Sequence, residues 1–234
     1  MEESKRSKIV RYIGMVLIPV VFLMTTTYII LLASGYKIEF SKGDIIQTGV
    51  IVVETKPKTA TLYVNGTSYA TGGSWDLTGL ISGTYSLKVS ADDYFTWGKQ
   101  IALTEGQVAL YENVVLFLRE PVTTTVDGNS EKADLVSDLN TQTPDSRVAI
   151  EDNEIWFDGA MVTRLSSEPY NVQVYPDDAH LSFIANNKFH VIEIDGGNDV
   201  TLFDLQNDAD YLFLNNGGNV LCLEGDSLKT VEIR

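Results

Sequence analysis

The longest apolar run in the chain occupies residues 12–33 and decides where everything after it can fold. It carries no charged residue over about 22 positions, and a helix of that length rises about 33 Å at 1.5 Å per residue. This length crosses the hydrocarbon core of a bilayer. We expect a transmembrane helix here rather than a buried core helix, which usually carries a polar stripe. Its expected landmarks are two interfacial aromatics, a proline that bends the helix or frees one carbonyl, and the last apolar residue: Tyr12, Tyr36, Pro19 and Ala33.

The charges on either side of this run predict its orientation. Residues 1–11 contain four basic residues, whereas only Lys37 and Lys42 follow the run closely. The positive-inside bias makes 1–11 a cytoplasmic tail, with residue 34 onwards exported. A cleaved signal peptide is the rival interpretation, because residues 33–35 are small. The run is longer than the 7–15 residues of a typical signal core, which favours an uncleaved anchor.

Charge and cysteine content exclude several classes of function. The chain has a net charge of −15, and after the basic tail 13 basic residues face 30 acidic ones. Nucleic acid is therefore not an expected partner, since phosphate binding needs clustered Lys and Arg. The acidity is best explained by solubility, with binding of cations or of a basic wall polymer as the alternative. A single cysteine, Cys222, excludes an intramolecular disulfide, and its leucine neighbours indicate a core position.

Residues 49–118 predict a small antiparallel β-sandwich, after a juxtamembrane segment at 34–48. Short apolar or alternating runs follow one another, with no helical period, as in residues 50–53, 61–64, 85–89 and 114–118. Asn65-Gly66 is the strongest short signal for a β-hairpin turn. The same residues form a glycosylation sequon with Thr67, but the turn explains them better.

Four stretches of this segment carry a family resemblance. They are Pro57-Lys58-Thr59-Ala60, Leu62-Tyr63-Val64-Asn65-Gly66, Leu80-Ile81-Ser82-Gly83-Thr84-Tyr85-Ser86-Leu87 and Asp93-Tyr94. In order and spacing they resemble the PEGA domain, with two glycines of its pattern replaced by Thr59 and Asp93. The resemblance implies a compact β-sandwich of prokaryotic surface and envelope proteins, often beside a membrane anchor. It implies binding rather than catalysis.

A polar segment at 119–146, rich in Thr, Ser, Asp and Asn, is expected to be a linker, with a short helix possible over 130–139. The module after it, 147–234, shows three similar units that begin at Asp145, Asp178 and Asp208. Each predicts a three-stranded meander, and residues 170–175 could add a fourth strand to the middle unit. The period resembles β-propeller blades. Three units are too few to close a ring, which leaves an open meander, completion by assembly, or a piece of a longer chain.

Sequence motifs for catalysis and metal binding are missing. His180 and His190 do not have metal-ligand spacing and are expected at the surface or in turns. No nucleophile elbow, P-loop or dinucleotide fingerprint occurs, so we expect neither a metal site nor a cofactor.

The expected fold class is mainly β with one transmembrane helix. The expected function is non-catalytic: a single-pass, membrane-anchored envelope protein that binds or scaffolds a surface protein or cell-wall glycan. A carboxylate-dependent glycan-processing enzyme is the alternative.

Residues 92–98 supply the candidate binding residues. If the strand period of two holds and Tyr94 points inward, Phe95 and Trp97 fall on the opposite face. We then expect both rings to be partly exposed and to suit a sugar face or a partner strand. The alternative is that the second module, the linker or a β-bulge covers them. The polar linker also predicts that the two modules unfold separately.

Overall fold

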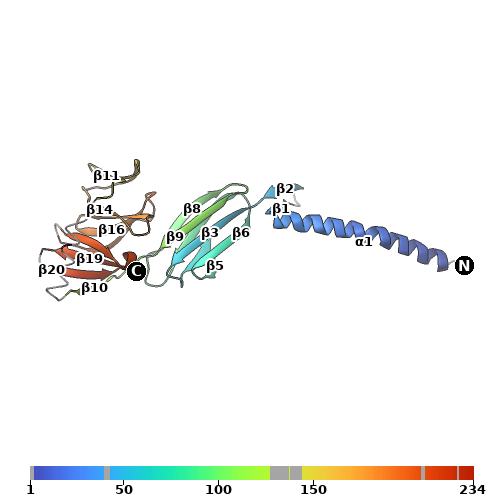
Figure 1. Cartoon of the computed structure of the whole chain (residues 1–234), viewed down its shortest axis with the longest axis horizontal. Coiled ribbons are helices and arrows are strands. Elements are labelled where there is room, and N and C mark those ends of the chain that lie inside the picture. Colours follow the sequence, from blue (N-terminus) through green and yellow to red (C-terminus); the bar gives the residue numbers. More distant parts are fainter. Residues whose placement is uncertain (1–2, 40–42, 127–136, 138–143, 207–208, 226) are drawn as a thin grey trace. The chain divides into compact units, whose positions relative to one another are not determined.

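A computed structural model describes residues 3–39, 43–126, 137, 144–206, 209–225 and 227–234 (Figure 1). It confirms a mainly β chain with one N-terminal helix, α1 (Glu3–Ala33). The strands form several small sheets, and over the described residues these sheets close into neither a barrel nor a propeller. The chain divides into two compact units, one made of residues 1–52, 76–85 and 102–110, the other of 53–75, 86–101 and 111–234.

The first unit contains the helix and the hairpin that follows it. Gly35 terminates helix α1 two residues after Ala33: its φ of +78° is left-handed, and its amide donates to the Leu32 carbonyl at 3.1 Å. Strands β1 (Tyr36–Glu39) and β2 (Asp44–Gln47) then pair antiparallel, with Tyr36 opposite Gln47. The Thr48 hydroxyl donates to the Gly35 carbonyl at 2.7 Å. This hydrogen bond holds the end of the hairpin against the C-terminal end of the helix.

Seven strands follow in the segment for which a sandwich was predicted. One sheet has the order β6-β3-β9 and the other the order β5-β4-β7-β8. Their apolar side chains are buried at alternate positions, as Leu62, Leu87 and Val89 show. The predicted Asn65-Gly66 hairpin is confirmed: both residues have positive φ, and Val64 pairs with Thr67. The strands are β3 (Gly49–Lys56), β4 (Thr61–Val64), β5 (Thr67–Thr71), β6 (Ser74–Leu80), β7 (Gly83–Ser90), β8 (Trp97–Leu103) and β9 (Val108–Val115).

The C-terminal segment forms three antiparallel meanders at the positions that its repeats predict. Residues 170–174 supply the fourth strand of the middle sheet, as expected. The sheets have the orders β11-β12-β13, β14-β15-β16-β17 and β10-β20-β19-β18. Their strands are β10 (Val122–Thr125), β11 (Val148–Glu151), β12 (Glu154–Phe157), β13 (Ala160–Arg164), β14 (Tyr170–Val174), β15 (His180–Ala185), β16 (Lys188–Glu193), β17 (Val200–Asp204), β18 (Asp210–Leu214), β19 (Asn219–Glu224) and β20 (Ser227–Glu232), with a 3₁₀ turn η1 (Asn215–Gly217).

Strand β10 lies inside the segment that was predicted to be a linker. It pairs antiparallel with β20, with Val122 opposite Glu232. All four of its residues are exposed, so the backbone ladder holds it and no buried face marks it in the sequence. The expectation of a linker is therefore wrong at 122–125. The helix considered for 130–139 falls outside the described residues, apart from Ser137.

Two apolar cores hold the C-terminal sheets. One includes Tyr175, Phe189 and Tyr211, and the other includes Ile155, Leu181 and Phe183. Cys222 is fully buried in the first core, as its neighbours predict, and burial raises the pKa of its thiol to about 12. Hydrophobic burial of these rings supplies the main drive for folding this segment.

Candidate functional site

The N-terminal helix is apolar and long enough to cross a membrane. Its apolar part, Arg11–Ala33, has a mean hydropathy of 2.4, and none of it is buried against the rest of the chain. Tyr12 is 71 % exposed, and the helix continues on both sides of Pro19. Tyr36 is half-buried at the start of β1. By length and composition, a signal sequence would meet the same criterion.

The aromatic segment near β8 differs from the prediction. Trp97 is only 2 % exposed, so its predicted exposure is wrong, whereas Phe95 is half-buried and packs against the core around Tyr175 and Tyr211. The Trp97 indole Nε1 donates to Glu193 Oε1 at 2.5 Å. Residues after 146 contact both rings, as the alternative interpretation held, although Phe95 stays partly exposed, as predicted. A binding role for Phe95 stays a prediction.

The face assignment failed because β8 starts only at Trp97. Residues 92–93 form a turn in which Asp93 has a φ of +66°, and Tyr94 makes an isolated bridge to Leu118. The strand period of two therefore cannot be counted from Tyr94 to Trp97. Within β8 itself, Trp97 shares the buried face with Ile101.

A charged cluster surrounds the Trp97 indole. The Lys99 ammonium lies 2.8 Å from Glu193 Oε2 and 2.6 Å from Asp195 Oδ2, and the Gly98 amide donates to Asn198 Oδ1 at 3.0 Å. Burial alone would lower the pKa of Lys99, but hydrogen bonds to Asp195 and Glu193 outweigh it and raise that pKa. Burial alone would raise the pKa of Asp195, but the hydrogen bonds from Lys99 and from the Gly197 amide outweigh it and lower that pKa. The cluster joins β8 to the end of β16 and the turn after it.

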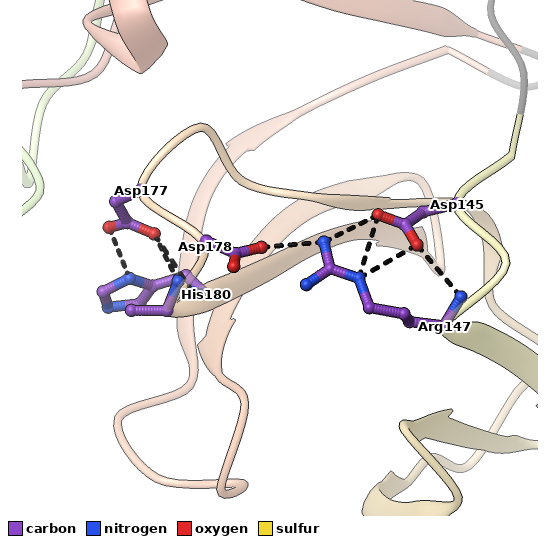
Figure 2. Close-up of polar contacts among 6 residues, drawn as sticks. Asp145, Arg147, Asp177, Asp178 and His180 are labelled. Atoms are coloured by element: carbon purple, nitrogen blue, oxygen red, sulfur yellow. Dashed lines mark hydrogen bonds and ion pairs between the residues drawn. The ribbon is translucent and has the colours of Figure 1, made fainter.

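Figure 2 shows a second polar network at the start of β15. Asp177 Oδ2 lies 2.8 Å from His180 Nδ1, and Asp177 Oδ1 accepts the Ala179 amide at 2.9 Å. His180 is buried, at 2 % exposure, against the rings of Phe117 and Tyr175 and is the first residue of β15, so its expected position at the surface or in a turn is wrong. Within the described part of the chain, no hydroxyl or thiol hydrogen-bonds to the His180 ring. The Asp177–His180 pair orders the turn that precedes β15.

Arg147 connects the first two of the predicted repeat starts (Figure 2). Its guanidinium lies 2.8 Å from Asp145 Oδ2 and 2.7 Å from Asp178 Oδ1. Hydrogen bonds from Arg147 lower the pKa of Asp145 to about 2. A hydrogen bond from Arg147 also lowers the pKa of Asp178, so both carboxylates are ionised at neutral pH. The described residues contain no group of three or more His, Cys, Asp or Glu side chains that could hold a metal.

A polar groove of about 560 Å³ lies on the sheet β5-β4-β7-β8. Its floor consists of two cross-strand pairs, Thr61 opposite Ser90 on β7 and Tyr63 opposite Lys88. The intervening Leu62 and Val89 are fully buried, so the floor residues stand on the outer face of the sheet. Its volume falls within the range of small-molecule sites, about 300–1,000 Å³.

One wall of the groove is the segment between β7 and β8. The Phe95 amide donates to the Phe117 carbonyl at 2.8 Å, and the Arg119 amide donates to the Asp93 carbonyl at 2.9 Å. These bonds fix Arg119 beside Asp93 along the groove. Sequence reasoning missed this site, because its residues come from three separate segments, 59–63, 88–96 and 119, and no local spacing unites them.

Comparison with known families gives one result for this chain. Residues 48–113 match the PEGA domain, which confirms the resemblance seen in the sequence. The match covers the strands from β3 to most of β9. No curated protein matches the chain. The likeness of residues 147–234 to propeller repeats stays weak.

Proposed function

We propose that this protein is a single-pass membrane protein of the cell envelope that displays its β-domains outside the cytoplasm to bind or scaffold surface components. The observation that carries the proposal is the succession of an unburied apolar helix and, about 15 residues later, a PEGA domain. A helix of this length in water would expose its whole apolar surface, which a bilayer covers. The basic tail before the helix favours a cytoplasmic N-terminus.

A non-catalytic role is supported by what the buried Glu193 and the half-buried Asp177 do. Glu193 accepts the Trp97 indole and pairs with Lys99, and Asp177 holds the turn before His180. A general acid or base needs a free partner position for its substrate. These carboxylates are instead used for structure, while the polar groove offers a surface for binding.

The proposal is tested by membrane attachment of the full chain. We expect the protein, expressed with a C-terminal tag, to resist alkaline carbonate extraction and to retain its N-terminal residues by intact mass. A matched variant, Leu17→Arg with Val21→Arg, should lose membrane retention, because each central arginine costs about 3 kcal/mol of insertion. Recovery of a soluble wild-type chain that begins near Tyr36 would instead identify a cleaved signal peptide.

A further inference from the structure

The polar groove on the sheet β5-β4-β7-β8 carries chemistry that the fold does not use. Five hydroxyl side chains line it, those of Thr59, Thr61, Tyr63, Ser90 and Thr96. Only the Thr61 hydroxyl is engaged, with Thr71 at 2.9 Å. The other four have no hydrogen-bond partner among the described residues, so each is free to donate to and accept from a ligand.

Four charged side chains complete the lining, and their charges cancel. Lys88 and Arg119 stand against Asp92 and Asp93, and none of the four forms an ion pair with any described residue. Lys88 Nζ lies 5.5 Å from the centre of the Tyr63 ring, a weak contact at an exposed site. The groove therefore offers charged donors and acceptors without favouring either sign of ligand.

From this lining we propose that the groove binds a neutral oligosaccharide. A sugar presents hydroxyl groups that both donate and accept, which matches a lining of hydroxyls, two bases and two acids. Its C–H faces pack on aromatic rings, and the half-buried Tyr63 ring lies in the floor. The inference rests on the proposed display of this domain at the cell surface.

Other ligand classes fit this lining poorly. A phosphate polymer would meet Asp92 and Asp93, and a polycation would meet Lys88 and Arg119. An extended peptide adds to a free sheet edge, but β4 and β7 are both interior strands of this sheet and already paired. The groove also has little apolar surface to hold a hydrophobic side chain.

The test is a ligand-observed NMR titration of the full chain in nanodiscs, without sugar-based detergent. The neutral probes are cellotetraose, chitotetraose and mannotetraose, and the comparison probes are sulfated cellotetraose and the peptide Ala-Glu-Lys-Ala. At least one neutral probe should bind saturably. Tyr63→Ala and Arg119→Gln should each weaken that binding at least tenfold.

Tyr69→Ala is the matched control. Tyr69 is 55 % exposed on β5 and does not line the groove, so its replacement should change the affinity less than twofold. Arg119 is exposed, so Arg119→Gln should melt as the wild type does.

Three results would overturn the inference: no saturable neutral probe, binding of only the sulfated or peptide probe, or equal affinities for the wild type, Tyr63→Ala and Arg119→Gln. The titration does not depend on membrane sidedness. A failed titration with the expected topology therefore rejects this inference alone, whereas sugar binding with inverted topology rejects only the proposed function.

Discussion

Replacing Glu193 by leucine tests how much the contacts of Glu193 with Trp97 and Lys99 on β8 contribute to the free energy of unfolding. The change leaves the indole N–H of Trp97 without its acceptor at a site that is 2 % exposed. An unsatisfied buried donor costs about 1–3 kcal/mol. Lys99 keeps Asp195 as a partner at 2.6 Å, so its ammonium is not left unpaired. Loss of the ion pair between Lys99 and Glu193 therefore adds at most about 1 kcal/mol to the cost. We expect Glu193→Leu to lower the free energy of unfolding by about 2–3 kcal/mol.

Glu193→Gln separates the two contributions. It keeps an oxygen acceptor for Trp97 and removes only the charge that faces Lys99, so its cost should be about 1 kcal/mol. The control is Arg164→Leu, which breaks a pair with Glu154 in which the Arg164 side chain is 71 % exposed. Such an exposed pair is worth about 0.2–1 kcal/mol.

The assay is urea denaturation of the full chain in micelles, followed by tryptophan fluorescence and by circular dichroism. A double-mutant cycle with Trp97→Phe should give a coupling energy of at least about 1 kcal/mol for the indole and Glu193. We also expect the two probes to report one transition, against the separate unfolding that the polar linker predicted. Equal costs for Glu193→Leu and Glu193→Gln, together with zero coupling, would refute the reasoning.

Three further outcomes are expected. Asp195 has a lowered folded pKa, so its stabilisation is complete above its unfolded pKa of about 4 and is lost as pH falls through the folded value. Lys99 has a raised folded pKa, so its stabilisation is complete below about pH 10 and is lost as pH rises through the folded value. The difference in urea midpoint between the wild type and Lys99→Met should therefore shrink both at low pH and at high pH. Gly196→Ala should lower the free energy of unfolding by about 1–3 kcal/mol, because φ is +83° and a Cβ would lie 2.4 Å from the Val162 carbonyl oxygen. Gly66→Ala, with a φ of +79° and open space around it, should cost less. Equal losses for the two variants would show that the clash does not contribute. Cys222 should resist thiol reagents at pH 8 until urea unfolds the chain, and rapid labelling of the native protein would show that its core opens.

Features set by local chemistry could be predicted from the sequence. The Asn65-Gly66 turn needs positive φ at two successive residues, and this residue pair supplies it. The alternation of apolar residues in β7 and the repeated meanders after Asp145 depend on neighbouring residues alone. The apolar helix has the plainest signal, because its length needs no tertiary context.

Features set by distant contacts could not be predicted. The hydrogen bond from Trp97 to Glu193 joins residues 96 positions apart, and no local pattern in the sequence predicts it. Strand β10 is an exposed run of Val and Thr that becomes a strand only because β20 offers a free edge. The groove floor could be placed by strand alternation, but its wall depends on the backbone bonds to residues 117–119.

The central claim is that the β-domains stand outside the cytoplasm on an uncleaved anchor, and site-directed thiol labelling tests it most directly. Ser68→Cys places a thiol on the exposed face of β5, and the buried Cys222 gives no background. Ser4→Cys places one in the N-terminal tail. A membrane-impermeant maleimide should label full-length Ser68→Cys in intact spheroplasts and should label Ser4→Cys only after lysis. Labelling of Ser4→Cys in intact spheroplasts, with Ser68→Cys protected until lysis, would contradict the account.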